Sequence, residues 1–198
     1  MAFIDLISSE MPNWPGFKRE ICISNSNDKI LEKQLQLIEI NLGSYYNKYN
    51  KTIYKNNKRW QSNKWQEMCS ENLFHVSYWN VESNELVCFC SIMPCEESIV
   101  EGEMSNIIYL YEIHVAPEWR NQKFGKSILN ALKEKLCPKA HLSGIELTVF
   151  SSNERAINFY RNNGFTLSYD SPSDKRRRTR TGIRIIRPTY YIMCYVLR

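Results

Sequence analysis

The sequence has little of what marks fibrous, disordered or membrane-spanning chains. Only seven of its 198 residues are glycine and seven are proline, too few for a collagen-like or low-complexity chain. No run approaches the 18 or more apolar residues of a membrane span. Residues 1–17 show no basic segment followed by an apolar core, so we expect neither a secretory signal nor a membrane partner. With 43% hydrophobic residues, the chain is expected to form one globular domain.

Metal-ligand patterns are missing as well. The seven cysteines include no CxxC pair, and the three histidines (His75, His114 and His141) are scattered along the chain. Zinc sites usually need such ligands at short spacings. We therefore expect no metal, and we interpret the odd number of cysteines in apolar surroundings as reduced thiols of an intracellular protein.

Positive charge is absent from one long stretch. The 55 residues from Trp65 to Trp119 contain ten glutamates and no lysine or arginine. Residues 170–198 have the opposite bias, eight bases against two acids, a local balance of +6 that exceeds the +5 of the whole chain. The acidic segment predicts attraction of a cationic partner. The basic segment leaves a nucleic-acid-binding or nucleosome-binding module as an alternative.

Hydrophobic spacing predicts a mixed α/β order without internal repeats. We expect helices near residues 28–46, 56–69, 127–136 and 154–163, and strands near 73–80, 86–94, 107–116, 145–150, 165–169 and 189–197. Gly43 is expected to end the first helix, and Ser151 with Glu154 has the spacing of a capping box. The expected single domain, residues 1–198, comprises an N-terminal helical extension (1–70), a core (71–170), a basic loop (171–187) and a last strand (188–198).

Three segments in order suggest chemistry: the apolar strand 109–115, the basic loop 120–125 and the helix that begins near Asn153. A loop that leads into a helix presents unpaired backbone N–H groups and the positive end of the helix dipole, which suits a pyrophosphate. Arg120, Lys123 and Lys126 add positive charge there. Strand, basic loop and helix occur together in many α/β proteins, so these residues alone make phosphate binding one interpretation among several.

These segments resemble the GNAT acetyltransferase superfamily. Its loop reads Arg/Gln-x-x-Gly-x-Gly/Ala; Arg120 and Gly125 fit, whereas Lys123 replaces the first glycine. Its later helix reads Asn-x-x-Ala-x-x-Phe/Leu-Tyr-x-x-x-Gly-Phe and is matched by Asn153, Ala156, Phe159, Tyr160, Gly164 and Phe165. The resemblance covers about residues 106–169. It implies one GNAT-like α/β domain, a mixed and mostly antiparallel sheet flanked by helices with extra N-terminal helices, and acetyl-CoA as cosubstrate.

A narrower resemblance rests on Tyr109-x-Tyr111-Glu112, on Leu147–Phe150, on residues 170–173 and on the tryptophan-containing helical region near the N-terminus. These segments look like the NatD family, N-alpha-terminal acetyltransferases selective for histones 4 and 2A, which begin Ser-Gly-Arg-Gly. The resemblance implies direct acetylation of the free serine amine, without a covalent intermediate. It also implies histone tails as partners, association with the ribosome, and a location in nucleus and cytoplasm. The acidic segment suits such a cationic substrate.

The same resemblance implies the cofactor contacts. They lie on the strand, in the basic loop, and near the second helix: Ile113, His114, Val115, Asn121, Gln122, Lys123, Phe124, Gly125, Lys126, Thr148, Asn153 and Asp170. Core packing explains Ile113 and Val115 equally well, and both interpretations hold if the cofactor uses their backbone.

Three residues are expected to act in catalysis. Glu112 is the first candidate for a base, directly or through a water, because burial raises a carboxyl pKa. An α-amine is already partly neutral at cellular pH, so a modest base suffices. Tyr111 is expected to hold the amine or polarise the thioester oxygen, and Tyr160 matches the GNAT position that protonates the leaving thiolate. The alternatives are a structural glutamate and ordinary strand aromatics.

The NatD resemblance implies the peptide contacts: Tyr54, Trp60, Glu101, Glu103, Tyr109, Tyr111, Tyr190 and Tyr191. Glu101 and Glu103 are expected to bind the substrate arginine, with a solvated hairpin as the alternative. Two other functions stay open: acetylation of a lysine or small amine, and nucleic-acid binding through residues 175–187, although we do not expect direct nucleic-acid binding.

Overall fold

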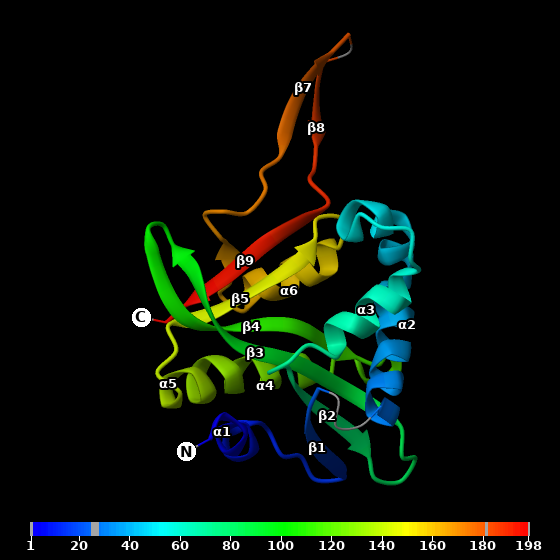
Figure 1. Ribbon diagram of the computed structural model, residues 1–198, viewed down its shortest axis with the longest axis vertical. Coiled ribbons are helices and arrows are strands. Elements are labelled where there is room, and N and C mark those ends of the chain that lie inside the picture. Colours follow the sequence, from blue (N-terminus) through cyan, green and yellow to red (C-terminus); the bar gives the residue numbers. More distant parts are fainter. Residues whose placement is uncertain (1, 25–27, 181, 198) are drawn as a thin grey trace.

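The computed structural model describes residues 2–24, 28–180 and 182–197; Met1 and Arg198, the ends of the expected domain, lie outside the described residues. The strands are β1 (Phe17–Ile23), β2 (Phe74–Asn80), β3 (Leu86–Val100), β4 (Glu103–Val115), β5 (Gly144–Phe150), β6 (Thr166–Leu167), β7 (Lys175–Thr179), β8 (Gly182–Ile186) and β9 (Tyr190–Val196). Seven of them form a sheet in the order β1-β2-β3-β4-β5-β9-β6, and β7-β8 stands apart (Figure 1).

Helices cover both faces of the sheet (Figure 1). They are α1 (Phe3–Glu10), α2 (Asp28–Tyr54), α3 (Trp60–Met68), α4 (Phe124–Ala131), α5 (Cys137–Lys139) and α6 (Glu154–Asn162), with a short 3-10 turn at Pro117–Trp119 and a π-helical turn at Leu132–Leu136 between α4 and α5. Buried side chains of α1, α4 and α6 join the larger core cluster. Those of α2 and α3 form a second cluster on the other face. No helix among the described residues is both long and apolar enough to cross a membrane.

The sheet is antiparallel except between β4 and β5, and that parallel contact is short. Only Ile108 with Ile145 and Tyr109 with Glu146 are paired there. Beyond Tyr109, β4 keeps its ladder with β3 as far as Val115, while β5 pairs with β9. The two central strands therefore separate over the second half of β4.

One residue of β4, Tyr111, is inserted relative to β3. An inserted residue changes which face the following side chains take. Leu110 before the bulge and Ile113 after it pack against the same core cluster. Tyr111 and Glu112, neighbours in the sequence, therefore both point to the face covered by α2 and α3, where Lys64 contacts Glu112.

The predicted fold class, one α/β domain with a mixed, mostly antiparallel sheet flanked by helices and extra helices at the N-terminus, is confirmed. The prediction that Gly43 ends the first helix is wrong, because α2 continues to Tyr54. Gly43 is buried inside the helix, and Trp60 of α3 would lie 3.8 Å from a Cβ at that position. This glycine permits close packing of two helices and does not end one.

Other local predictions need correction. The N-terminal extension is not purely helical, because β1 pairs with β2 at the sheet edge. The expected basic loop contains the β7-β8 hairpin. The expected capping box is wrong: the side chain of Asn153 caps α6 by accepting the Ala156 N–H, and the Ser151 hydroxyl instead donates to the carbonyl of Pro188.

We predict opposite effects of alanine at two buried glycines. In Gly144→Ala the new Cβ would meet the carbonyl oxygen of Tyr195 at 2.2 Å, so β5 and β9 must move apart. We expect a loss of about 1–3 kcal/mol in the free energy of unfolding. In the control Gly43→Ala the nearest atom is 3.5 Å away, and a helical alanine should stabilise by about 0.5–1 kcal/mol. Urea denaturation of both variants checks this; equal effects would contradict it.

Candidate active site

A cavity of about 1020 Å³ opens where β4 and β5 separate. Residues 109–115 of β4 line one side, and Thr148–Phe150 of β5 line the other. Residues of α2, α3, α4 and α6 and the start of β9 complete the lining. Helices from both faces of the sheet thus contribute side chains to one space, and the separation of the strands connects the two faces.

One end of the cavity is built to bind an anion. Asn121 and Lys123 both have left-handed backbone conformations, with φ of 65° and 67°. Such turns direct successive N–H groups to one point. The N–H groups of Phe124, Gly125 and Lys126 lie before the first bond of α4, from the Ser127 N–H to the Lys123 carbonyl. With the cationic side chains of this segment, these groups form a positive concave surface.

The conformation at Lys123 explains why GNAT loops usually carry glycine there. A left-handed conformation costs a non-glycine residue roughly 1–2 kcal/mol. In this chain Lys123 has φ 67° and ψ 6° as the N-cap of α4, and its side chain lines the cavity. Lysine in place of glycine at position 123 therefore adds a cation to the anion-binding end of the cavity, and it strains the backbone there.

The middle of the cavity presents a strand edge. From Leu110 to Val115, β4 pairs with β3 on one side, and no strand among the described residues pairs with it on the other. An extended ligand with amide groups can pair with such an edge as an added strand would.

Glu112 lies at the centre of a buried charge network. Lys64 Nζ donates to its Oε1 at 2.9 Å, and His114 Nε2 to its Oε2 at 2.6 Å. Lys64 also contacts Glu67 Oε2 at 2.5 Å. Burial alone would raise the pKa of Glu112, but Lys64 and His114 outweigh burial and lower that pKa to about 2. The expectation of a raised pKa was therefore wrong, because the pairing with Lys64 could not be seen in the sequence.

The network continues beyond His114. Its Nδ1 lies 3.2 Å from Asn41 Nδ2, and Arg120 donates to Asn41 Oδ1. A carboxylate only accepts, so His114 donates from Nε2 to Glu112 and accepts at Nδ1 from the amide of Asn41, as a neutral imidazole does. A continuous polar chain thus joins α3, β4, α2 and the anion-binding loop.

Tyrosines surround this network. The hydroxyls of Tyr109 and Thr148 are 2.6 Å apart, and burial raises the pKa of Tyr109 to about 12. The ring of Tyr111 meets that of Tyr109 edge-on at 4.9 Å. Tyr160 on α6 is buried, and burial and the charge of Glu112 raise its pKa. Its phenol is therefore protonated at neutral pH and can donate a hydrogen bond, although it is a weaker acid than a free tyrosine.

Most residues predicted for the site line this one cavity. They are Tyr54, Tyr109, Tyr111, Glu112, Ile113, His114, Val115, Lys123, Asn121, Phe124, Gly125, Lys126, Thr148, Asn153, Tyr160 and Tyr190. The structure brings together segments that are far apart in the chain, as the predicted roles require, while the roles themselves stay predictions.

Six predicted residues lie elsewhere. Trp60 is buried, stacks on Tyr46 and donates to Asn47 Oδ1 at 3.0 Å, so it joins α2 to α3. Tyr191 is buried in the larger core cluster and does not line the cavity. Gln122 lines separate surface hollows on the other side of its loop.

The remaining three are acidic. Glu101 and Glu103 are exposed at the turn between β3 and β4, outside the cavity lining. Asp170 is exposed after β6, and its charge acts on Glu146. Of the ten glutamates in the acidic segment, only Glu67 and Glu112 line the cavity, and Lys64 pairs with both. The acidic segment therefore does not line the cavity as a whole, and the attraction of a cationic partner stays a prediction.

A separate acidic group lies beside Tyr109. Glu146 of β5 is its neighbour in the parallel register and is only 4% exposed. Burial raises the pKa of Glu146, and the charges of Asp170 and Glu97 raise it further. Glu97 also acts on the pKa of both Tyr109 and Tyr111. These three carboxylates, Glu97, Glu146 and Asp170, are called the acidic cluster below.

Sequence reasoning did not identify Lys64, Glu67, Asn41 or Glu146. One signal was present for Lys64: it lies four residues after Trp60 on a helix, so both share a face, and that face is buried. A lysine on a buried face needs a carboxylate partner. Glu112, a lone acid in an apolar strand, was the matching signal.

We predict that Lys64→Met destabilises the protein by about 3–5 kcal/mol at pH 7, because it leaves Glu112 buried without its cation. The double variant Lys64→Met/Glu112→Gln is the control and should lose less. The pKa of Glu112 is lower in the folded state than its usual value of 4.5, so the pairing stabilises above that pH and is lost as pH falls towards 2.

Thermal or urea denaturation between pH 7 and 2 measures this difference. The wild type should lose its advantage over the double variant between about pH 4.5 and 2. An advantage that stays constant over that range would show that Glu112 has no depressed pKa.

The comparisons with known proteins agree with this architecture. The model of the acetyltransferase (GNAT) family matches residues 35–165. N-alpha-acetyltransferase 40 of Saccharomyces cerevisiae is 36% identical over 188 residues, covering 84% of this chain and 65% of the yeast protein. The chain thus spans less than two thirds of the length of that relative.

Two solved structures share the fold at low identity. Arabidopsis thaliana NAA60 with a bisubstrate analogue is 15% identical with a TM-score of 0.53, covering 90% of this chain and 100% of that one. The PaiA N-acetyltransferase of Thermoplasma acidophilum with coenzyme A is 16% identical with a TM-score of 0.52, covering 90% and 99%. The matched residues, 35–165, include β2 to β5 and the anion-binding loop before α4. The chain therefore belongs to the GNAT family of acetyltransferases.

Proposed function

We propose that this chain is an N-alpha-terminal acetyltransferase that transfers the acetyl group of acetyl-CoA to the free serine amine of peptides beginning Ser-Gly-Arg-Gly, as histones 4 and 2A do. The observation that carries the proposal is the cavity between β4 and β5, which has an anion-binding loop at one end and tyrosines at the other. Glu146 of the acidic cluster is paired with one of these tyrosines, Tyr109, although it does not line the cavity. The likeness to the yeast N-alpha-acetyltransferase supports it. Ribosome association and the locations nucleus and cytoplasm stay predictions.

The residues present fit the cosubstrate. Acetyl-coenzyme A would supply the acetyl group as an activated thioester. The left-handed turn at Lys123, the N–H groups that begin α4 and the side chain of Arg120 suit a diphosphate. The unpaired edge of β4, residues 113–115, suits the amides of a pantetheine chain.

Glu112 is better suited to stabilise a positive charge than to accept a proton as a general base. Its pKa of about 2 makes it a weak base, and both of its oxygens already accept hydrogen bonds. An α-amine with a pKa near 8 is partly neutral without help. We propose that the carboxylate stabilises the positive charge that develops on the attacking nitrogen and that the proton leaves through water.

Tyr160 is proposed to donate a proton to the leaving thiolate. Its burial and the charge of Glu112 keep the phenol protonated. A thiolate with a pKa near 8.5 leaves readily, so this donor assists and is not essential. Tyr54, Tyr111 and Tyr190 line the cavity and are proposed to surround the first peptide residues.

The acidic cluster is proposed to bind the substrate arginine in place of Glu101 and Glu103. Glu146 and Glu97 act on Tyr109, which lines the cavity, whereas Glu101 and Glu103 lie at an exposed turn. A cation would also relieve the mutual repulsion that raises the pKa of Glu146.

The direct test incubates the protein with acetyl-CoA and a Ser-Gly-Arg-Gly peptide, and locates the acetyl group by mass spectrometry. We expect one acetyl group on the α-amine. A peptide whose N-terminus is already blocked but which contains lysine should stay unmodified. Equal acetylation of the blocked peptide would instead favour the lysine or small-amine alternative and overturn the N-terminal proposal.

The double variant Lys64→Met/Glu112→Gln tests the role of Glu112 in the same assay. It removes both buried charges together, so neither is left in the core without its partner. Turnover should fall by about 100-fold, with coenzyme A affinity within about threefold of wild type. Unchanged turnover would remove Glu112 from the mechanism.

We predict that Glu146→Gln raises KM about 10-fold for the Ser-Gly-Arg-Gly peptide, because a charge-assisted contact to the arginine is lost. The KM for a Ser-Gly-Ala-Gly peptide should stay within about twofold. Glu103→Gln is the matched control, since it removes the same charge from the exposed turn, and it should change neither value. The reverse result would assign the arginine to the turn between β3 and β4. Steady-state kinetics with both peptides make the measurement.

A further inference from the structure

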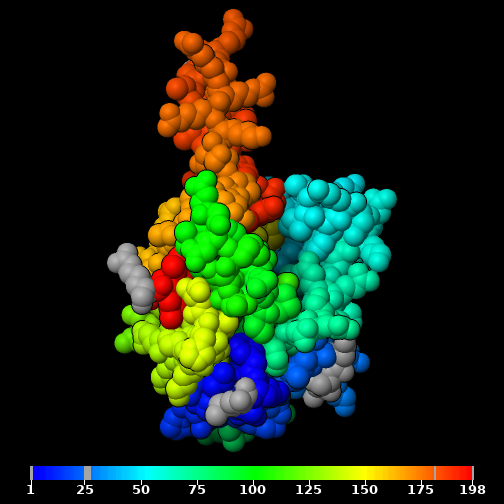
Figure 2. Space-filling view, turned by 60° about the vertical axis from the view of Figure 1, so that its left-hand side comes forward, coloured from blue at the N-terminus to red at the C-terminus, as the bar shows by residue number. Residues whose placement is uncertain are grey.

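The β7-β8 ribbon, residues 175–186, projects from the domain. Figure 1 shows it standing beyond the sheet, and Figure 2 shows it as an orange projection away from the body of the molecule. Every described residue of its two strands is exposed. Ile183 and Ile185 are 69% and 59% exposed, so the ribbon buries no core of its own. The ribbon therefore gains no stability from packing within the described chain. Binding of a partner would explain why the protein carries such an exposed ribbon.

The ribbon carries a charge that the protein leaves unbalanced. Residues 175–187 contain seven bases and no acid. Only Arg187 has an ion-pair partner within the described ranges, Glu154 at 2.9 Å. Arg177 and Arg184 lie directly opposite each other across the two strands, and like charges in that position are destabilising. An anionic partner would relieve this repulsion.

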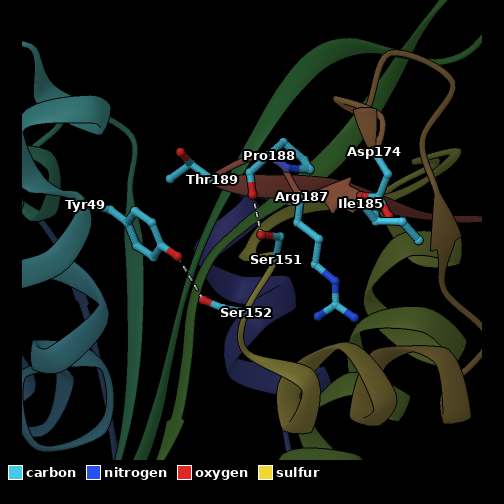
Figure 3. Close-up of a pocket in the computed structure, with 8 residues that line it drawn as sticks. All are labelled: Tyr49, Ser151, Ser152, Asp174, Ile185, Arg187, Pro188 and Thr189. Carbon is cyan, nitrogen blue, oxygen red and sulfur yellow. Dashed lines mark hydrogen bonds between the residues drawn. The ribbon is translucent and has the colours of Figure 1, made fainter. Parts of the chain in front are cut away.

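Three contacts fix the base of the ribbon, and Figure 3 shows one of them, between Ser151 and Pro188. Tyr191 donates to Asp174 Oδ1 at 2.5 Å just before β7, while Arg187 binds Glu154 and the Ser151 hydroxyl donates to the carbonyl of Pro188 just after β8. They border a hollow of about 520 Å³ between α2, the β5–α6 turn and the ribbon. The ribbon is therefore presented in a defined direction.

Both faces of the ribbon are cationic. By strand alternation and register, Arg176 and Arg178 share one face with Ile183 and Ile185. The other face carries a second set of side chains: Lys175, Arg177, Arg184 and Ile186. A flat anionic surface would meet only one of these faces, whereas a groove between two phosphate chains would meet both.

We propose that the β7-β8 ribbon inserts into the major groove of B-form duplex DNA. That groove, about 12 Å wide, admits a two-stranded ribbon, whereas the major groove of A-form RNA is deep and narrow. With the face of Ile183 and Ile185 turned towards the base edges, the isoleucines can contact thymine methyl groups, and the long arginine side chains of both faces would reach past the edges of the ribbon to the phosphates of the two walls. This proposal departs from the expectation of no direct nucleic-acid binding and takes up the alternative that the basic segment left open.

This assignment does not depend on acetyl transfer, but it has a consequence for it. Only Arg187, Pro188 and Thr189 separate the ribbon from Tyr190, which lines the cavity. A duplex held by the ribbon would therefore lie close to the acceptor end of the cavity.

The test measures binding of the full chain to a labelled 20-base-pair DNA duplex by fluorescence anisotropy at several salt concentrations. Six phosphate contacts predict a slope of about −5 in log K against log salt. The variant Arg177→Gln/Arg178→Gln/Arg184→Gln should weaken binding at least about 30-fold at low salt and reduce the slope by about 3. The control Lys29→Gln/Lys33→Gln/Lys135→Gln removes the same charge from exposed positions on α2 and the π-helical turn and should stay within about twofold of wild type.

Competing partners are measured in the same assay: a duplex RNA of the same sequence, vesicles containing phosphatidylserine, and poly-glutamate. We expect DNA to bind at least about fivefold more tightly than each. Equal or tighter binding of any competitor, or equal affinities of the two triple variants, would overturn the proposal. Both variants should melt like wild type and acetylate the Ser-Gly-Arg-Gly peptide equally without DNA, so a failure of DNA binding is distinct from a failure of the proposed enzyme activity.

Discussion

The site depends on the short contact between β4 and β5, which pair at only two positions before they separate. The neighbouring pairs β3-β4 and β5-β9 keep long ladders, so this separation leaves one edge of β4 without a partner strand and opens a space that helices from both faces line. The bulge at Tyr111 acts on the same strand: it turns Tyr111 and Glu112 to the same face. The unpaired edge of β4 that is proposed for the cosubstrate, and the adjacent polar side chains that are proposed for the acceptor, thus arise from two irregularities in one strand.

The buried polar network around Glu112 and Lys64 is the second constraint, because the fold is stable only if each buried charge has its partner. A buried carboxylate and a buried lysine are each costly alone, and each is stable here because the other is present. His114 and Asn41 extend the network to Arg120, so the anion-binding loop and the acceptor face share one chain of hydrogen bonds. The same pairing that makes Glu112 tolerable in the core also makes it a weak base, which limits what chemistry it can do.

Local patterns predicted the fold well where a segment carries its own signal. The strand at 109–115 and the helix after Asn153 were placed correctly because their hydrophobic spacing is local, whereas the loop predicted at 120–125 is shorter, since α4 begins at Phe124. The predictions failed where a long-range contact decides the outcome. Gly43 lies inside a helix because Trp60 packs nearby, and Glu112 has a low pKa because Lys64, 48 residues away in the sequence, contacts it. Glu101 and Glu103 were named from a resemblance to a family with acidic residues in that loop, and a resemblance alone could not show that both lie at an exposed turn outside the cavity lining.

The charge distribution takes a different meaning once its geometry is known. The acidic segment of the sequence does not form one anionic site. The basic segment is not a separate tail. Most of the acidic segment is dispersed over the surface. One of its glutamates, Glu97, acts on Tyr109 together with Glu146 of β5, and Asp170 acts on Glu146. The basic segment is concentrated on a projecting ribbon whose base lies a few residues from the same cavity. A basic peptide near the ribbon would be repelled by it and attracted by the acidic cluster, so the two charges together favour a peptide that enters with its cationic residues directed away from the ribbon.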